Sequence, residues 1–137
     1  MRTHNLRPQI SIAQSEHPQL LALAAGGGGS LSQAAESLLT EVERAKVVPD
    51  KKLPADIVRM HSRVQYRTDR DESVDVTLVY PVEADISQGK ISVLTPIGAA
   101  LIGLRTGQSM TWETRDGRKN VLTVLSVIQN ADEAAEA

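Results

Sequence analysis

The chain has 137 residues, which suffices for one ordinary domain or a small domain with an appendage and excludes two full domains. Its net charge is −2, with 41% apolar and 23% charged residues, so overall charge would not drive tight binding to a nucleic-acid backbone. The absence of cysteine excludes disulfides and thiolate sites and favours a cytoplasmic location. With no signal peptide and no run approaching the roughly 18 to 20 apolar residues of a membrane span, we expect no membrane association.

Residues 1–50 predict a short strand followed by an antiparallel helical hairpin, a short coiled coil over about 15–48. Ile10 and Ile12 alternate with polar residues, as in one brief strand. Ser15 is a predicted cap for the first helix, which four glycines at 26–29 would end, and Ser30 or Ser32 would cap the second. Apolar residues of the second helix recur every three or four positions, the seam of a helix packed on one partner. They are Leu31, Ala35, Leu38, Val42 and Ala45.

Residues 51–130 predict a second domain, rich in β-strands, after a boundary at Pro49 and Pro54. From residue 57 the period changes to two, which predicts a strand with one buried and one basic face. Further strands are expected at 74–80, 91–94, 110–114 and 121–128, with one short helix starting at Pro96. The fold class is therefore α+β: a helical hairpin followed by an antiparallel sheet with one short helix, and an acidic flexible tail at 131–137.

The sequence predicts no catalytic, cofactor-binding or metal-ligating residues. The three histidines lie in separate predicted elements without metal-ligand spacing, and no serine lies in a nucleophile motif. The glycine run follows a helix and lacks the GKS or GKT ending of a phosphate-binding loop. We therefore expect no cofactor and no small-molecule substrate.

A basic face on the strand from residue 57 has two interpretations of equal weight. Alternate residues project together, so the face could contact phosphates or an acidic protein. It could instead be a solvated face whose charge is balanced by the acidic residues that follow it. The basic residues are Arg59, His61, Arg63 and Arg67; the acidic ones are Asp69, Asp71, Glu72 and Asp75.

The segment ADISQGKISVLTPIGAALIGLRTGQ at 84–108 resembles the C-terminal domain of the bacterial Gre transcript-cleavage factors. Four further segments are similar to the Rnk family, which are regulators of nucleoside diphosphate kinase. They are RPQISI at 7–12, EVERA at 41–45, LPADIVRMHSRVQYR at 53–67 and TLVYP at 77–81. The resemblance covers about residues 7–130. It implies an FKBP-like fold for the C-terminal domain and binding to RNA polymerase at the rim of its secondary channel.

The polymerase-binding residues implied by this resemblance are Thr95, Pro96 and Ile97. Leu94 departs from the pattern, because cleavage factors often carry a polar or acidic residue there. Cleavage factors also extend a long coiled coil whose acidic tip holds magnesium. Here the first predicted helix is only about 17 Å long. No acidic residue lies between Glu16 and Glu36, so we expect no transcript cleavage.

The leading hypothesis is a monomeric, non-enzymatic regulator that binds RNA polymerase, competes with Gre factors and influences nucleoside diphosphate kinase levels. One alternative is a nucleic-acid-binding protein that uses the basic face, with weak or polymerase-mediated contacts. The other is a peptidyl-prolyl isomerase, as an FKBP-like fold would allow. That activity needs an aromatic-lined pocket, which we expect three aromatic residues on three different strands not to form.

Overall fold

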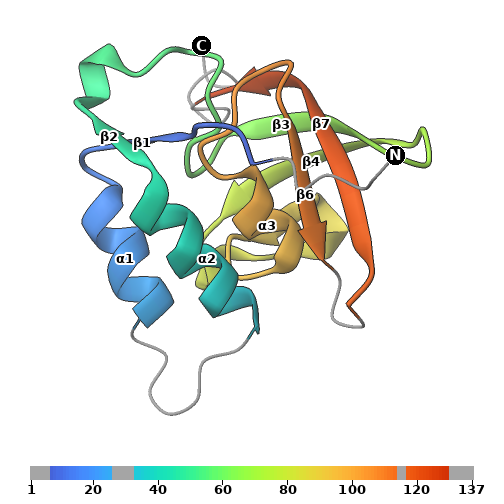
Figure 1. The fold of residues 1–137 in the computed structure, drawn as a ribbon, viewed down its shortest axis with the longest axis horizontal. Helices are drawn as coiled ribbons and strands as arrows, with labels where there is room; N and C mark the ends of the chain where they lie inside the picture. Colours follow the sequence, from blue (N-terminus) through green and yellow to red (C-terminus); the bar gives the residue numbers. More distant parts are fainter. Residues whose placement is uncertain (1–6, 26–32, 114–116, 130–137) are drawn as a thin grey trace.

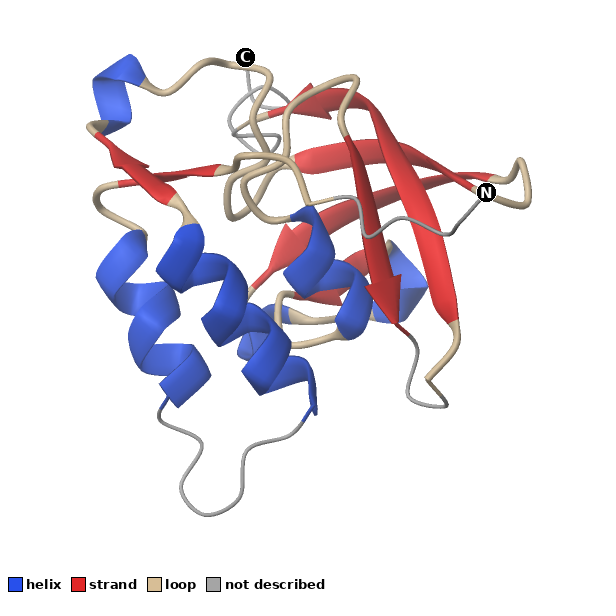
Figure 2. Cartoon of the chain, in the orientation of Figure 1, coloured by secondary structure: helices blue, strands red, loops and turns tan. Residues whose placement is uncertain are grey.

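The computed structural model describes residues 7–25, 33–113 and 117–129, and these form an α+β fold with helices packed beside a twisted sheet (Figures 1 and 2). The helices are α1 (His17–Ala25), α2 (Gln33–Arg44) and α3 (Pro96–Leu101), with the 3-10 helices η1 (Asp50–Lys52), η2 (Pro81–Glu83) and η3 (Ile86–Gln88). The strands are β1 (Ser11–Ala13), β2 (Lys46–Val48), β3 (Arg63–Thr68), β4 (Ser73–Val79), β5 (Lys90–Ser92), β6 (Ser109–Glu113) and β7 (Lys119–Ile128).

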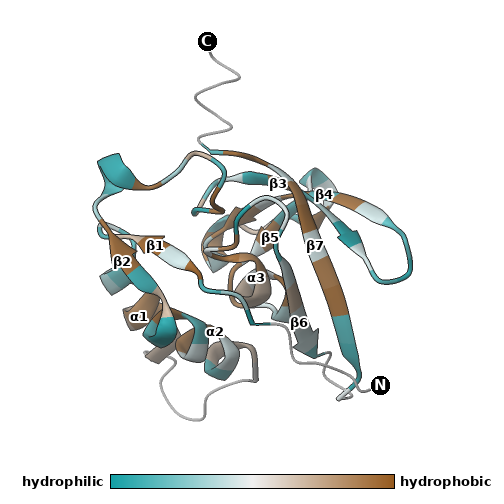
Figure 3. Cartoon of the chain, turned by 45° about the horizontal axis from the view of Figure 1, so that its top comes forward, coloured by the Kyte–Doolittle hydropathy of each residue, from teal (hydrophilic) through white to brown (hydrophobic). Residues whose placement is uncertain are grey.

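The main sheet has the strand order β5-β4-β3-β7-β6. All neighbouring strands are antiparallel except β4 and β5, which run parallel, so the predicted antiparallel sheet is confirmed apart from one edge. The charged turn after residue 68 joins β3 to β4, and it is hydrophilic in Figure 3, as is η1. A second, parallel pair joins β1 to β2. The brief strand near Ile10 and Ile12 is confirmed, whereas β2 was not predicted.

The strand predicted from residue 57 is wrong over its first half, because β3 begins only at Arg63. A turn precedes it: the Arg59 amide donates to the Ser62 hydroxyl, and the Ser62 amide donates to the Arg59 carbonyl. His61 in this turn has a φ of 70°, which no strand residue adopts. The predicted burial is nevertheless confirmed for all four inward-facing residues: Val58, Met60, Val64 and Tyr66.

The helical hairpin packs against the sheet domain. α1 lies beside α2, and α2 also packs on α3 (Figure 1). The predicted seam is confirmed at Ala35, Leu38 and Val42, which are buried, and at Ala45, which is partly buried. One apolar core contains Leu38 and Val42 together with Val64 and Leu101. The hairpin and the sheet therefore share a core.

Ser15 differs from its predicted role as a helix cap. Its hydroxyl and its amide both donate to the carboxylate of Asp50, so the side chain ties the start of the hairpin to η1. Several predicted features lie outside the described residues. They are the glycines at 26–29, Ser30, Leu31, Ser32 and the tail at 131–137. No helix within the described ranges is long and apolar enough to cross a membrane.

Candidate functional site

Thr95, Pro96 and Ile97 lie where the turn after β5 enters α3: Thr95 precedes the helix, and Pro96 and Ile97 are its first two residues. The Thr95 hydroxyl donates to the Ser92 carbonyl at 2.7 Å and accepts from the Gly98 amide at 3.0 Å, so Thr95 is the N-cap of α3. The Leu94 amide donates to the Ser92 hydroxyl at 2.9 Å. Pro96 occupies the first helical position. Proline suits this position because its φ is already fixed near the helical value and because an amide proton there would have no partner within the helix.

The same three residues are partly exposed, while α3 behind them is buried from Gly98 to Leu101. Ile97 and Leu94 also pack against the core. Leu94, the residue that departs from the Gre pattern, therefore has a packing role here. The start of α3 thus presents partly exposed apolar side chains next to buried helix residues.

An apolar hollow of about 430 Å³ lies beside this turn. Two of the three aromatic residues, Tyr66 from β3 and Trp112 from β6, line it together with Pro96 and Ile97. The expectation that the aromatic residues could not form a pocket is wrong for these two, since β3 and β6 flank β7 in the sheet. The other lining residues are Ala84, Ile86, Lys90, Ile91, Ser92 and Thr95.

Tyr80, the third aromatic residue, lies outside the hollow. Its ring meets the His61 ring edge-on at 5.8 Å between centroids, and its hydroxyl donates to Gln19 at 3.3 Å. Burial raises the pKa of the Tyr80 phenol, and the carboxylates of Glu16 and Glu83 raise it further.

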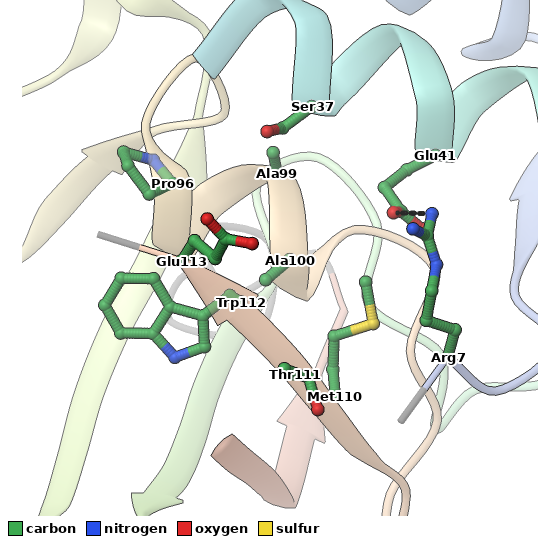
Figure 4. A pocket seen from close by; sticks show the side chains of 10 residues that line it. All are labelled: Arg7, Ser37, Glu41, Pro96, Ala99, Ala100, Met110, Thr111, Trp112 and Glu113. Carbon is green, nitrogen blue, oxygen red and sulfur yellow. Dashed lines mark hydrogen bonds and ion pairs between the residues drawn. The ribbon is translucent and has the colours of Figure 1, made fainter. Parts of the chain in front are cut away.

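A second, smaller pocket of about 250 Å³ lies between α2, α3 and β6 (Figure 4). Pro96 and Trp112 line both pockets. In the second pocket, Arg7 donates to the buried carboxylate of Glu41 at 2.6 Å. Arg44 donates to the other Glu41 oxygen at 2.7 Å and to the Pro8 carbonyl at 2.8 Å. Glu41 is thus neutralised by two arginines and fastens the N-terminal segment to α2.

The proposed basic face is divided between two regions, and each of its residues contacts a carboxylate. Arg59 lies before β3, with a side chain 19% exposed, and contacts Glu16 and Asp50, both at 3.1 Å. Arg63 and Arg67 do project from one face of β3, as predicted, and pair with Asp75 at 2.9 Å and Asp71 at 3.6 Å. This arrangement favours the interpretation of a charge-balanced, solvated face.

His61, the fourth basic-face residue, bonds Glu83. The Nε2 atom of His61 lies 2.8 and 3.0 Å from the two carboxylate oxygens of Glu83. This hydrogen bond, with another from the Tyr80 amide, lowers the pKa of the Glu83 carboxyl. The described residues contain no cluster of three or more histidine, aspartate or glutamate side chains able to hold a metal ion.

Comparison with known proteins assigns the family. The family model described as the C-terminal part of the transcription elongation factors GreA and GreB matches residues 53–129, more than half of the chain. The chain belongs to this GreA/GreB C-terminal family. The match spans β3 to β7 and includes the turn at Thr95 and the hollow beside it.

Among curated proteins, the chain is 40% identical to the regulator of nucleoside diphosphate kinase of Escherichia coli K12 over 103 residues, which are 74% of this chain and 76% of that protein. It is 40% identical to the elongation factor GreA of Roseiflexus castenholzii over 85 residues, 61% of this chain and 54% of that protein. It therefore matches only about half of that GreA. The Rnk and Gre resemblances seen in the sequence are confirmed.

A solved structure of a GreA/GreB elongation factor from Nitrosomonas europaea matches the fold with a TM-score of 0.70 and 32% identity. The match covers 89% of this chain and 99% of that one. The α+β fold of a Gre-type factor thus extends over nearly the whole chain. The proteins compared here carry the names of regulators or transcription elongation factors.

Proposed function

We propose that this protein is a bacterial transcription regulator that binds RNA polymerase at the rim of the secondary channel through Thr95, Pro96 and Ile97. The family match over residues 53–129 is the main support. The rigid, partly exposed turn at these residues adds to it, because a preorganised surface loses little conformational entropy on binding. Such a regulator would act in the cytoplasm as a monomer, without a cofactor or substrate.

We further propose that binding does not lead to transcript cleavage. α1 and α2 have 9 and 12 residues, so they extend about 14 and 18 Å. α2 packs along α3, which fixes the hairpin against the sheet domain rather than leaving it as a projecting arm. No acidic residue between Glu16 and Glu36 could hold magnesium near the hairpin tip. The protein would compete with Gre factors and influence nucleoside diphosphate kinase levels indirectly.

A pull-down with purified RNA polymerase tests the binding surface. We expect the wild-type protein to retain polymerase and to reduce transcript cleavage by added GreA, while producing no cleavage itself. The double variant Pro96→Ala with Ile97→Asp should lose most polymerase binding, since it places a charge in the centre of the proposed contact.

The matched control is Val82→Asp, which introduces the same charge at an apolar side chain that is 92% exposed and outside the turn. It should bind polymerase as the wild type does. Ile97 packs partly on the core, so each variant is checked by its thermal unfolding, and Ile97→Ala replaces Ile97→Asp if that variant is unfolded. A folded double variant that binds like the wild type would show that the surface is wrongly assigned.

A further inference from the structure

The smaller pocket, between α2, α3 and β6, is positively charged at one end. Arg7 and Arg44 both donate to the buried carboxylate of Glu41, so two guanidinium groups share one acid. Arg7 lines the pocket with a side chain that is 43% exposed. A guanidinium has five N–H donors, and among the described residues that of Arg7 bonds only Glu41. Arg7 therefore keeps donors for an anion in the pocket.

The opposite end of the smaller pocket is negatively charged. Glu113 lines it and is exposed, and its carboxylate makes no ion pair or hydrogen bond with the described part of the chain. Trp112, the preceding residue, also lines the pocket, and an aromatic ring attracts a cation placed over its face. In Figure 4, Trp112 and Glu113 lie on one side of Ala99, and Arg7 lies on the other. This end therefore favours a cation.

The two charged ends are separated along β6. The arginine end lies at the level of Met110, whose sulfur contacts Arg44 at 3.9 Å. Glu113 follows further along the same strand, which places it about 10 Å away at about 3.4 Å per residue. The lining also includes the apolar side chains of Ala99 and Ala100. A hydrogen bond of about 3 Å at each end takes up part of this distance, so a ligand that spans it has its two charges several bonds apart.

We propose that the smaller pocket binds a small linear zwitterion, with its carboxylate on Arg7 and its ammonium between Glu113 and the Trp112 ring. Glu113 repels a ligand that is only anionic, and the arginine end repels one that is only cationic, so a ligand with both charges fits best. The volume of about 250 Å³ is below the usual range of drug-sized sites, which restricts the ligand to a small molecule such as an ω-amino acid. The ligand is bound and not transformed.

Trp112 is the single tryptophan of the chain and lines the pocket, so its fluorescence reports on occupancy. We expect 6-aminohexanoate, titrated into the full chain, to give a saturable change. Its analogues 6-hydroxyhexanoate and 6-aminohexanamide keep the length of the molecule, and each lacks one charge. Each should bind about two- to fivefold more weakly, as expected for the loss of one partly exposed ion pair. Adipate should also bind more weakly, because it brings a second carboxylate to Glu113.

Glu113→Lys reverses the charge at the end assigned to the ammonium. We expect it to reverse the preference, so that adipate binds more tightly than 6-aminohexanoate. Glu113 is exposed, so the melting temperature should stay close to that of the wild type. If this variant is unfolded, Glu113→Gln replaces it and should abolish the preference for 6-aminohexanoate over 6-hydroxyhexanoate. Glu72→Lys is the matched control, since Glu72 is an exposed acid between β3 and β4, outside the pocket. It should keep the wild-type order of affinities.

The proposal is overturned if 6-aminohexanoate gives no saturable change, if either singly charged analogue binds equally well, or if the folded Glu113 variant keeps the wild-type preference. A reversed preference in Glu72→Lys as well would show a general effect of net charge and would also overturn it. The titrations use the free protein and leave Thr95, Pro96 and Ile97 unchanged, so their result is separate from the outcome of the polymerase pull-down.

Discussion

At the scale of single residues, Gly98 determines how closely the turn before α3 approaches β5. A Cβ atom at this position would lie 2.2 Å from the Ser92 carbonyl oxygen and 2.8 Å from the Val93 Cα. Both neighbours are backbone atoms, so the turn itself would have to move. We expect Gly98→Ala to lower the free energy of unfolding by about 1 to 3 kcal/mol, the usual cost of overpacking. Urea unfolding measures it, and a value within about 0.5 kcal/mol of the wild type would contradict the tight approach.

His61 and Glu83 predict a pH dependence at the same scale. The pKa of Glu83 is lower in the folded than in the unfolded protein, so the ionised carboxylate stabilises the fold. This stabilisation is fully present at pH values above the unfolded pKa of about 4.3. It is lost as the pH falls through the folded pKa. We expect His61→Ala to raise the pKa of Glu83 towards its ordinary range. An NMR titration of the Glu83 carboxyl carbon measures this. His17→Ala, on α1, is the control and should leave that pKa unchanged; an equal shift in both variants would exclude the direct hydrogen bond as its cause.

At the scale of elements, periodicity predicted which side chains are buried better than it predicted where strands begin. Val58 and Met60 are buried as alternation required, yet they precede β3. The turn there depends on hydrogen bonds of Ser62, which a hydropathy pattern does not contain. β2 has only three residues and follows α2 almost directly, too short for a period to be visible. The parallel direction of β5 likewise has no signature in a period of two.

The sequence predicted those residues of the candidate site that are adjacent in the chain, but not those that only the fold brings together. Thr95, Pro96 and Ile97 belong to one continuous motif, so the sequence identified them directly. Tyr66 and Trp112 lie 46 positions apart and meet only because β7 pairs with both β3 and β6. Strand order is a property of the folded sheet, and the sequence reasoning that separated these aromatic residues had no access to it.

At the scale of the whole molecule, the shared core makes the hairpin and the sheet interdependent. Leu38 and Val42 on α2 belong to the same buried cluster as residues of β3, α3 and β7. Arg59 adds a polar connection, since it contacts Glu16 at the start of α1 and Asp50 in η1. Apolar and polar contacts therefore cross the boundary that the prolines predict near residue 50.

This continuity predicts that the hairpin and the sheet unfold together. Helical circular dichroism reports on α1 and α2, and Trp112 fluorescence reports on β6, so both signals should give one urea transition. Leu38 is fully buried, and Leu38→Ala should lower the free energy of unfolding by about 2 to 5 kcal/mol in both signals equally. Leu23→Ala, on a partly buried side chain of α1, should cost less while keeping the signals coincident. Loss of helical signal at lower urea than the change in Trp112 fluorescence would mean that the hairpin unfolds on its own. The hairpin would then not be fixed against the sheet, and the argument that it is no projecting arm would be wrong.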